Sequence, residues 1–128
     1  MFLSDLIKKI DFTNEISFVK LASYEGISSS GAIKDLIGLN TSIEGRHVII
    51  VEDIVDTGES IHHMVELLKA KRPASVAVCT LFFKPASYSR TEEIKYRAME
   101  IGNEFIVGYG LDYDQVGRSL KDIYVVTE

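Results

Sequence analysis

The strongest hydrophobic signal in the chain is a run of four consecutive apolar residues at positions 48–51. A run of this kind predicts a strand that is buried on both faces. Two acids, Glu52 and Asp53, follow the run, and residues 56–58 then predict a tight turn. An amphipathic helix opens at Ser60. The amide groups of such a turn, together with the helix dipole, favour a phosphorylated ligand.

Helices and strands alternate along the rest of the hydrophobic pattern. Helical spacing of apolar residues predicts a helix over residues 1–10 and another from Ser60 to about Lys71, which Pro73 prevents from continuing. Apolar stretches predict strands at residues 16–21, 32–39, 76–83, 96–101, 105–109 and 123–126. The alternation predicts an α/β fold with a mostly parallel sheet flanked by helices, in a single domain over residues 1–128.

Several polar residues allow two interpretations. Residues 23–31 contain two glycines and four serines, which is typical of a solvated loop or of a mobile lid over a site. Asp56 is either a turn or helix-cap residue, or a group with a chemical role. We expect His62 and His63 to be exposed rather than bound to zinc, because we find no cysteine or acid at metal-ligand spacing on their helix.

The composition narrows the class of protein. At 128 residues, 46% apolar and 26% charged, the chain has the make-up of one soluble globular domain, and its net charge of −5 argues against non-specific nucleic-acid binding. Cys79, the only cysteine, lies in an apolar run and is expected to be a small core residue. No apolar run reaches transmembrane length, and residues 1–9 lack the order of a secretory signal. We therefore expect a cytoplasmic protein that binds neither nucleic acid nor membrane.

Charged residues follow the predicted strands at three places: the acids of residues 52–56, then Lys84, and later Asp112 with Arg118. Ligands of an open parallel sheet bind beyond the carboxyl ends of its strands, so these groups are candidates for one site. Adjacent carboxylates can accept hydrogen bonds from sugar hydroxyls or hold Mg²⁺, although a charged pair at a strand end is also common without any such role.

The sequence lacks the motifs of several other kinds of active site. Glu59 follows Gly58 where a nucleoside-triphosphatase loop would need its lysine, and the glycine spacing of that loop is absent. We find no Ser-His-Asp, paired-cysteine or H-E-x-x-H arrangement either.

Residues 48–60, V-I-I-V-E-D-I-V-D-T-G-E-S, closely resemble the phosphoribosyl-pyrophosphate-binding motif of type I phosphoribosyltransferases. The remaining motifs resemble the hypoxanthine-guanine branch of that family in their order and spacing: K-L-A-S-Y at residues 20–24, L-F-F-K at 81–84, F-I-V-G-Y at 105–109, L-D-Y at 111–113, and Arg118. The resemblance covers essentially the whole chain and implies the phosphoribosyltransferase fold.

The resemblance implies that ribose and phosphate bind along one continuous stretch: Glu52, Asp53, Ile54, Val55, Asp56, Thr57, Gly58, Glu59 and Ser60. Within it, Glu52 and Asp53 would hold the ribose hydroxyls, directly or through Mg²⁺, and Asp56 would accept the proton from N7 of the purine. The backbone and hydroxyl groups of residues 56–60 would hold the 5′-phosphate. Because Glu59 adds an acid there, its side chain should point away to solvent.

The purine and pyrophosphate groups are assigned by the same resemblance. Lys84 would donate to the 6-oxo group, Phe105 would stack on the base, and Ile106 would meet the base edge through its backbone. Asp112, beside the purine, would bind a second Mg²⁺, and Arg118 would bind pyrophosphate.

Ser23 and Tyr24 would belong to the catalytic loop that closes over the reacting centre and excludes water. The sequence begins at a helix that in the family follows a strand and the pyrophosphate-binding loop. The resemblance therefore leads us to expect an N-terminally truncated fold without that strand and loop.

Taken whole, the resemblance implies a Mg²⁺-dependent pentosyl transferase of purine salvage. Such an enzyme transfers the phosphoribosyl group of phosphoribosyl pyrophosphate to N9 of hypoxanthine or guanine, giving IMP or GMP and pyrophosphate. A dimer or tetramer is expected from the family alone. The alternatives are a non-catalytic nucleotide-binding module and an inactive, truncated remnant of the enzyme.

Overall fold

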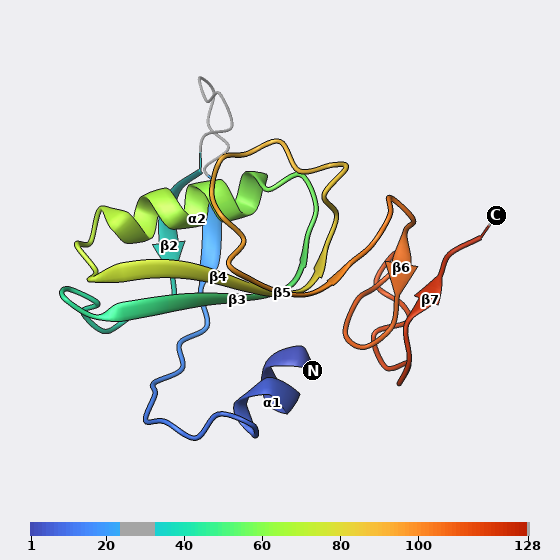
Figure 1. Cartoon of the computed structure of the whole chain (residues 1–128), viewed down its shortest axis with the longest axis horizontal. Helices are drawn as coiled ribbons and strands as arrows, with labels where there is room; N and C mark the ends of the chain where they lie inside the picture. The colour runs from blue at the N-terminus through green and yellow to red at the C-terminus, as the bar shows by residue number, and fades with distance from the viewer. Residues whose placement is uncertain (24–32, 128) are drawn as a thin grey trace.

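Three parallel strands, β3 (His47–Val55), β4 (Ser75–Phe83) and β5 (Tyr96–Glu100), form the centre of the structure, which is a computed structural model. They are hydrogen-bonded in the order β3-β4-β5. Helix α2 (Glu59–Lys69) connects β3 to β4 and packs across one face of the sheet (Figure 1). The predicted α/β fold with its parallel sheet is confirmed.

The structure describes residues 1–23 and 33–127, and for residues 22–23 and 33–35 it describes the backbone alone. The predicted loop or lid at 23–31 therefore falls almost wholly outside the described residues. No helix within the described ranges has both the length and the apolar character that a bilayer crossing requires.

Two antiparallel ribbons and a short helix accompany the sheet. Strand β1 (Lys20–Ser23) pairs with β2 (Ile33–Ile37), and β6 (Ile106–Val107) pairs with β7 (Tyr124–Val125). Figure 1 shows the β6–β7 ribbon beyond the carboxyl ends of the central strands, and helix α1 (Phe2–Ile7) on the side of the sheet opposite α2. The ribbon therefore lies at the edge of the sheet where ligands are expected.

Helix α2 supplies much of the hydrophobic core. Its buried side chains recur at the spacing of one helical face and pack into one cluster with the sheet: Ile61, Met64, Val65 and Leu68. Full burial of each such side chain is worth about 1.5–3 kcal/mol. Glu59 in the first turn and Lys69 in the last turn both complement the helix dipole. The packing of this helix fixes the position of its N-terminus beside the sheet.

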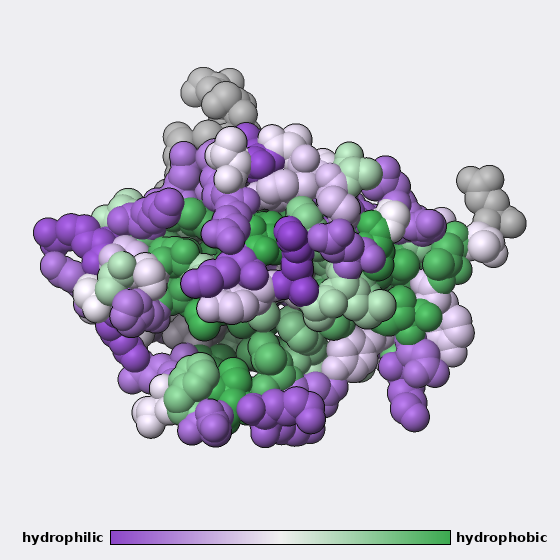
Figure 2. Space-filling view, in the orientation of Figure 1, coloured by the Kyte–Doolittle hydropathy of each residue, from purple (hydrophilic) through white to green (hydrophobic). Residues whose placement is uncertain are grey.

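Strand β3 differs from the prediction in two respects. It does not end before the acids but continues to Val55, because Ile54 and Val55 extend the register with β4. The prediction of burial on both faces is wrong: Ile50 is 8% exposed, but Ile49 is 49% exposed. Helix α2 covers the face of Ile50, whereas among the described helices α1 contacts β3 from the other side, where Figure 2 shows apolar side chains reaching the surface.

Other predicted elements are shorter than expected. The predicted strand at 105–109 is reduced to β6 because the backbone turns left-handed immediately afterwards, with φ of +105° at Gly108, +52° at Tyr109 and +96° at Gly110. The predicted strand at 16–21 forms only from Lys20 onward. The strands predicted in the second half of the chain, β4, β5 and β7, are confirmed with small shifts at their ends.

Candidate active site

The carboxyl ends of β3 and β4 bring Asp56 and Lys84 together. The register pairs Val55 with Phe83, so the residues that follow these two strands are neighbours. The Lys84 amide donates to the Val55 carbonyl at 3.0 Å, and its side-chain Nζ lies 3.2 Å from Asp56 Oδ2. The Lys84 side chain is 8% exposed and that of Asp56 is 50% exposed. A buried cation is thus paired with an acid that remains open to solvent.

The turn after Asp56 leads directly into α2. Gly58 is the N-cap residue, with φ of +86° and no side-chain cap, and its carbonyl accepts from the His62 amide at 2.9 Å. Asp56 is therefore not the helix cap. The first amides of a helix lack intrahelical acceptors. Thr57 Oγ1 reaches the Glu59 amide only at 3.4 Å. The turn and helix start thus present backbone donors beside the Asp56–Lys84 pair.

Glu59 does not crowd this turn. Its side chain is 66% exposed and lies 3.8 Å from both Arg90 and His63. This placement agrees with the expectation that its carboxylate points to solvent.

Glu52 and Asp53 lie half-buried within β3, just before the turn. Burial raises the pKa of the Glu52 carboxyl above its usual range, and the neighbouring charge of Asp53 raises it further. A Cβ built on Gly110 would lie 3.9 Å from Asp53 Oδ2, so this carboxylate is next to the loop after β6. A carboxyl group that resists ionisation beside a second acid is a place where a cation or sugar hydroxyls would be favourable.

The loop after β6 contains a second charged pair. Arg118 lies 3.1 Å from Asp112 and donates to the Gly110 carbonyl at 2.9 Å. The other Asp112 oxygen accepts from the Gln115 amide at 2.8 Å. These contacts order the loop, and they place Asp112 and Arg118 beside each other.

Two of the predicted purine-binding residues, Phe105 and Ile106, lie at the start of the β6–β7 ribbon. Phe105, which is 53% exposed, packs edge-on against Tyr113 with ring centroids 5.7 Å apart. Ile106 is part of β6. The ring of Phe105 is therefore available to stack on a planar ligand. Tyr24 and the side chain of Ser23 fall outside the described residues.

Carboxylates that suit Mg²⁺ are present, although the described residues contain no group of three or more His, Cys, Asp or Glu that could hold a metal by themselves. Mg²⁺ is usually bound through one or two carboxylates, with water and substrate phosphates completing its shell. The raised pKa of Glu52 beside Asp53 fits that mode of binding, because a cation would offset the repulsion between the two charges.

The two histidines of α2 were expected to be exposed, and that expectation is wrong: the side chain of His62 is 26% exposed and that of His63 is 30% exposed. His62 donates from Nδ1 to Glu92 Oε1 at 2.5 Å. Glu66, one turn along α2, lies 3.5 Å from Nε2. The helix therefore does carry an acid within reach of His62. The partner Glu92 is distant from His62 in sequence, and no hydrophobic periodicity around Glu92 predicts their contact.

The segment of residues 84–92, which we name the strap, makes contacts beyond Lys84 that the sequence did not predict. Its Ser89 amide and hydroxyl both donate to the Thr57 carbonyl, at 3.2 and 3.3 Å. Tyr88 packs on Phe83 with ring centroids 5.2 Å apart. The polar sequence of residues 86–95 predicts a linker, yet the strap contacts the turn directly.

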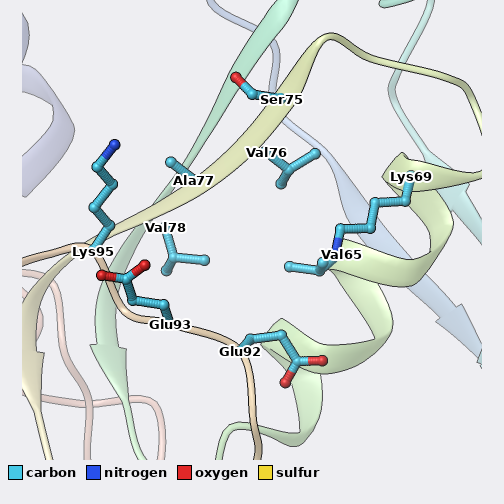
Figure 3. A pocket seen from close by; sticks show the side chains of 9 residues that line it. All are labelled: Val65, Lys69, Ser75, Val76, Ala77, Val78, Glu92, Glu93 and Lys95. Carbon is cyan, nitrogen blue, oxygen red and sulfur yellow. The ribbon is translucent and has the colours of Figure 1, made fainter.

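A separate hollow of about 340 Å³ lies between α2, β4 and the end of the strap. Figure 3 shows apolar side chains of α2 and β4 along it and charged side chains at its rim: Val65, Lys69, Ser75, Val76, Ala77, Val78, Glu92, Glu93 and Lys95. None of the predicted site residues lines it, so it is distinct from the candidate site.

The sequence profile of the phosphoribosyl transferase domain matches residues 1–114. The chain is 42% identical over 128 residues to the hypoxanthine-guanine phosphoribosyltransferase of Streptococcus thermophilus, covering 99% of this chain and 71% of that protein.

A longer relative and a solved structure agree. The bifunctional protein TilS/HprT of Listeria innocua is 42% identical over 126 residues, which is 98% of this chain but only 19% of that protein. The chain therefore spans about a fifth of the length of this bifunctional relative. The crystal structure of a hypoxanthine phosphoribosyltransferase from Staphylococcus aureus superposes with a TM-score of 0.85 at 41% identity, covering 98% of this chain and 69% of that one.

Proposed function

This chain belongs to the phosphoribosyl transferase family, and on that basis we propose that it transfers the phosphoribosyl group of phosphoribosyl pyrophosphate to N9 of hypoxanthine or guanine. The products are IMP or GMP and pyrophosphate, so the reaction is one of purine salvage. The observation that carries the proposal is the 3.2 Å contact between Lys84 and Asp56 at the start of a helix. It joins a hydrogen-bond donor, an acid and a phosphate-binding turn within one small region.

The base is recognised by Lys84 and the β6–β7 ribbon. The ammonium of Lys84 donates to the 6-oxo group, which adenine lacks. The ring of Phe105 stacks on the base, and the backbone of Ile106 meets its edge. Asp112 lies beside the purine. These roles follow from the family motifs and are supported by the buried Lys84 and the exposed Phe105 ring.

The phosphate and ribose are held along residues 52–60. The amides of residues 56–60 and the hydroxyls of Thr57 and Ser60 hold the 5′-phosphate at the N-terminus of α2. Ile54 and Val55 bring the backbone to this point. Glu52 and Asp53 bind the ribose hydroxyls.

Asp56 acts as general base. As the N9 electron pair bonds to C1′ of the ribose, the bond from C1′ to pyrophosphate breaks and its electrons leave with pyrophosphate. The proton on N7 passes to the Asp56 carboxylate, which makes N9 a better nucleophile. Carboxylates nearby also stabilise the positive charge that develops on the sugar.

Mg²⁺ is the proposed cofactor, held by Glu52 and Asp53 and, for a second ion, by Asp112. When bound, it supplies positive charge that stabilises the departing pyrophosphate. Arg118 adds a fixed cation on the pyrophosphate side. Ser23 and Tyr24 are proposed to exclude water from the reacting centre.

Residues 1–128 are proposed to act as one phosphoribosyltransferase domain. We also propose a cytoplasmic location and a homo-oligomer, a dimer or a tetramer, with no nucleic-acid or membrane partner. The single cysteine is compatible with a reducing compartment.

The test is a nucleotide-formation assay with phosphoribosyl pyrophosphate, Mg²⁺ and hypoxanthine or guanine. We expect IMP or GMP and pyrophosphate in equal amounts, no product after chelation of Mg²⁺, and no AMP from adenine. Failure to form nucleotide from either oxopurine would overturn the proposal. If calorimetry then still detected IMP binding, the function would be that of a nucleotide-binding module.

A further inference from the structure

The strap contacts the turn at residues 56–60, which we name the phosphate turn, and fixes one side of it. It starts at Lys84, whose amide donates a hydrogen bond to the Val55 carbonyl at the end of β3. The amides of Ser87 and Tyr88 both donate to the Lys84 carbonyl and close the first turn of the strap. From there the two bonds from Ser89 reach the Thr57 carbonyl. The turn is thus held from β3 on one side and from the strap on the other.

Tyr88 fills the space directly against Gly58. A Cβ built on Gly58 would lie 2.3 Å from Tyr88 Cε2, a distance at which atoms overlap, and 3.1 Å from Arg90 Cγ. The absence of a side chain at Gly58 therefore lets the Tyr88 ring contact the backbone that caps α2. Because this backbone carries the amides proposed for the 5′-phosphate, displacement of the ring would free the turn to move.

A chain of hydrogen bonds holds Tyr88 in this position. Its hydroxyl donates to the Glu92 carbonyl at 2.6 Å, and the Glu92 carboxylate accepts from His62 Nδ1 at 2.5 Å. His62 lies near the start of α2, and Tyr88 contacts the N-cap residue Gly58. This series of hydrogen bonds therefore starts and ends at the N-terminus of the helix. Burial acts to raise the pKa of Glu92, but the hydrogen bond and charge of His62 and the charge of Arg90 outweigh it and lower that pKa overall.

We propose that Tyr88, Glu92 and His62 are positioning residues for the ribose 5′-phosphate: they hold the turn at residues 56–60 in its binding geometry without touching the ligand. The inference rests on the proposed function and adds to it a role that the family motifs do not assign. Among the described residues, the three side chains make no hydrogen bond or ion pair with the Lys84 side chain or with the β6–β7 ribbon. The hydrogen bond from the Tyr88 amide to the Lys84 carbonyl belongs to the backbone and is kept in Tyr88→Phe. The effect of the substitutions should therefore be confined to the phosphate half of the site.

The experiment compares ligands with and without the phosphate. Calorimetry would measure the binding of IMP and of inosine to the unaltered protein and to Tyr88→Phe, Glu92→Gln and His62→Asn. Tyr88→Phe and His62→Asn each remove one of these hydrogen bonds, and Glu92→Gln replaces the charged acceptor of His62 by a weaker neutral one, so we expect IMP affinity to fall about three- to tenfold while inosine affinity is unchanged. In the assay, KM for phosphoribosyl pyrophosphate should rise by the same factor while KM for hypoxanthine does not.

The matched controls are Tyr96→Phe and Glu93→Gln, which alter an exposed tyrosine on β5 and the carboxylate next to Glu92. Both should leave the two affinities unchanged. Thermal unfolding of every variant shows whether it is folded, and the three substitutions give three independent tests. Equal losses for IMP and inosine, or no loss for either, would overturn the positioning role. An unaltered protein that binds neither ligand and forms no nucleotide would instead overturn the proposed function, and the inference with it.

Discussion

The ammonium of Lys84 lies 3.2 Å from the carboxylate of Asp56, and the two residues follow adjacent parallel strands. Although they are far apart in sequence, the register of β3 and β4 makes them neighbours. In the proposed reaction they act on the same edge of the purine, Lys84 at its 6-oxo group and Asp56 at N7.

Asp56→Asn should reduce turnover far more than nucleotide binding. Asparagine keeps the shape and can still accept a hydrogen bond, but it cannot take the N7 proton at neutral pH. General-base catalysis typically contributes about 10²–10⁴-fold, so kcat should fall by that factor while the Kd for IMP changes only a few-fold. The exposed Asp11→Asn serves as the control. Equal losses of turnover and binding would contradict the general-base role.

Lys84→Met should weaken selection for the oxopurine. Methionine fills a similar volume in a position that is 6% exposed, and the half-exposed Asp56 stays hydrated, so the fold should be retained. Loss of a charged hydrogen bond, about 1.5–3 kcal/mol, should raise KM for hypoxanthine by ten-fold or more and narrow its advantage over adenine. Lys121→Met, at an exposed site, should change neither value. An unchanged ratio of hypoxanthine to adenine activity would contradict the proposed role of Lys84 in recognising the 6-oxo group.

Gly58→Ala should destabilise the fold more than Gly45→Ala. Both glycines have positive φ, +86° and +71°, so both substitutions carry the conformational cost of about 1–2 kcal/mol. Only at Gly58 would the new Cβ also overlap Tyr88, because nothing lies within 4 Å of such an atom at Gly45. The free energies of unfolding from urea titrations should therefore differ by about 1–3 kcal/mol. Similar values for the two variants would show that the strap moves aside freely.

Glu52→Gln should stabilise the protein at neutral pH. The pKa of Glu52 is raised above its ordinary 4.5 by burial and by Asp53, so its protonated form favours the folded state. That stability is fully present below pH 4.5 and is lost as pH rises through the higher folded value. Glutamine stays neutral throughout, so the variant should have the higher Tm at pH 7, and the difference should shrink toward pH 4.5. The exposed Glu104→Gln should show no such trend, and a lower Tm for Glu52→Gln at pH 7 would refute this reasoning.

Periodicity predicted the elements that bury one continuous face. Helix α2 formed close to its expected position because its apolar residues repeat at the period of a helix, and strand β4 did so because its residues form one apolar run. The end of β3 could not be predicted in the same way. Two acids interrupt its apolar run, and only pairing with β4 carries the strand on to Val55.

The contacts around the phosphate turn could not be predicted from the sequence for a different reason. His62 and Glu92 are brought together by the path of the strap, and polar residues in a connecting segment carry no hydrophobic pattern that could reveal it. The left-handed backbone at Tyr109 was equally invisible, since a non-glycine residue with positive φ is not marked by its type. The sequence could suggest which residues belong to the site, but not what supports them.

The order of β3, α2 and β4 along the chain has a consequence for folding. These elements are consecutive, so residues 47–83 can associate without closing a long loop, and the helix and both strands bury the same core. The phosphate turn lies inside this local unit, whereas Phe105 and Asp112 belong to the later β6–β7 region. We therefore expect the amides of β3, α2 and β4 to be the slowest to exchange with deuterium, so that the ribose-phosphate half of the site persists through fluctuations that open the purine half.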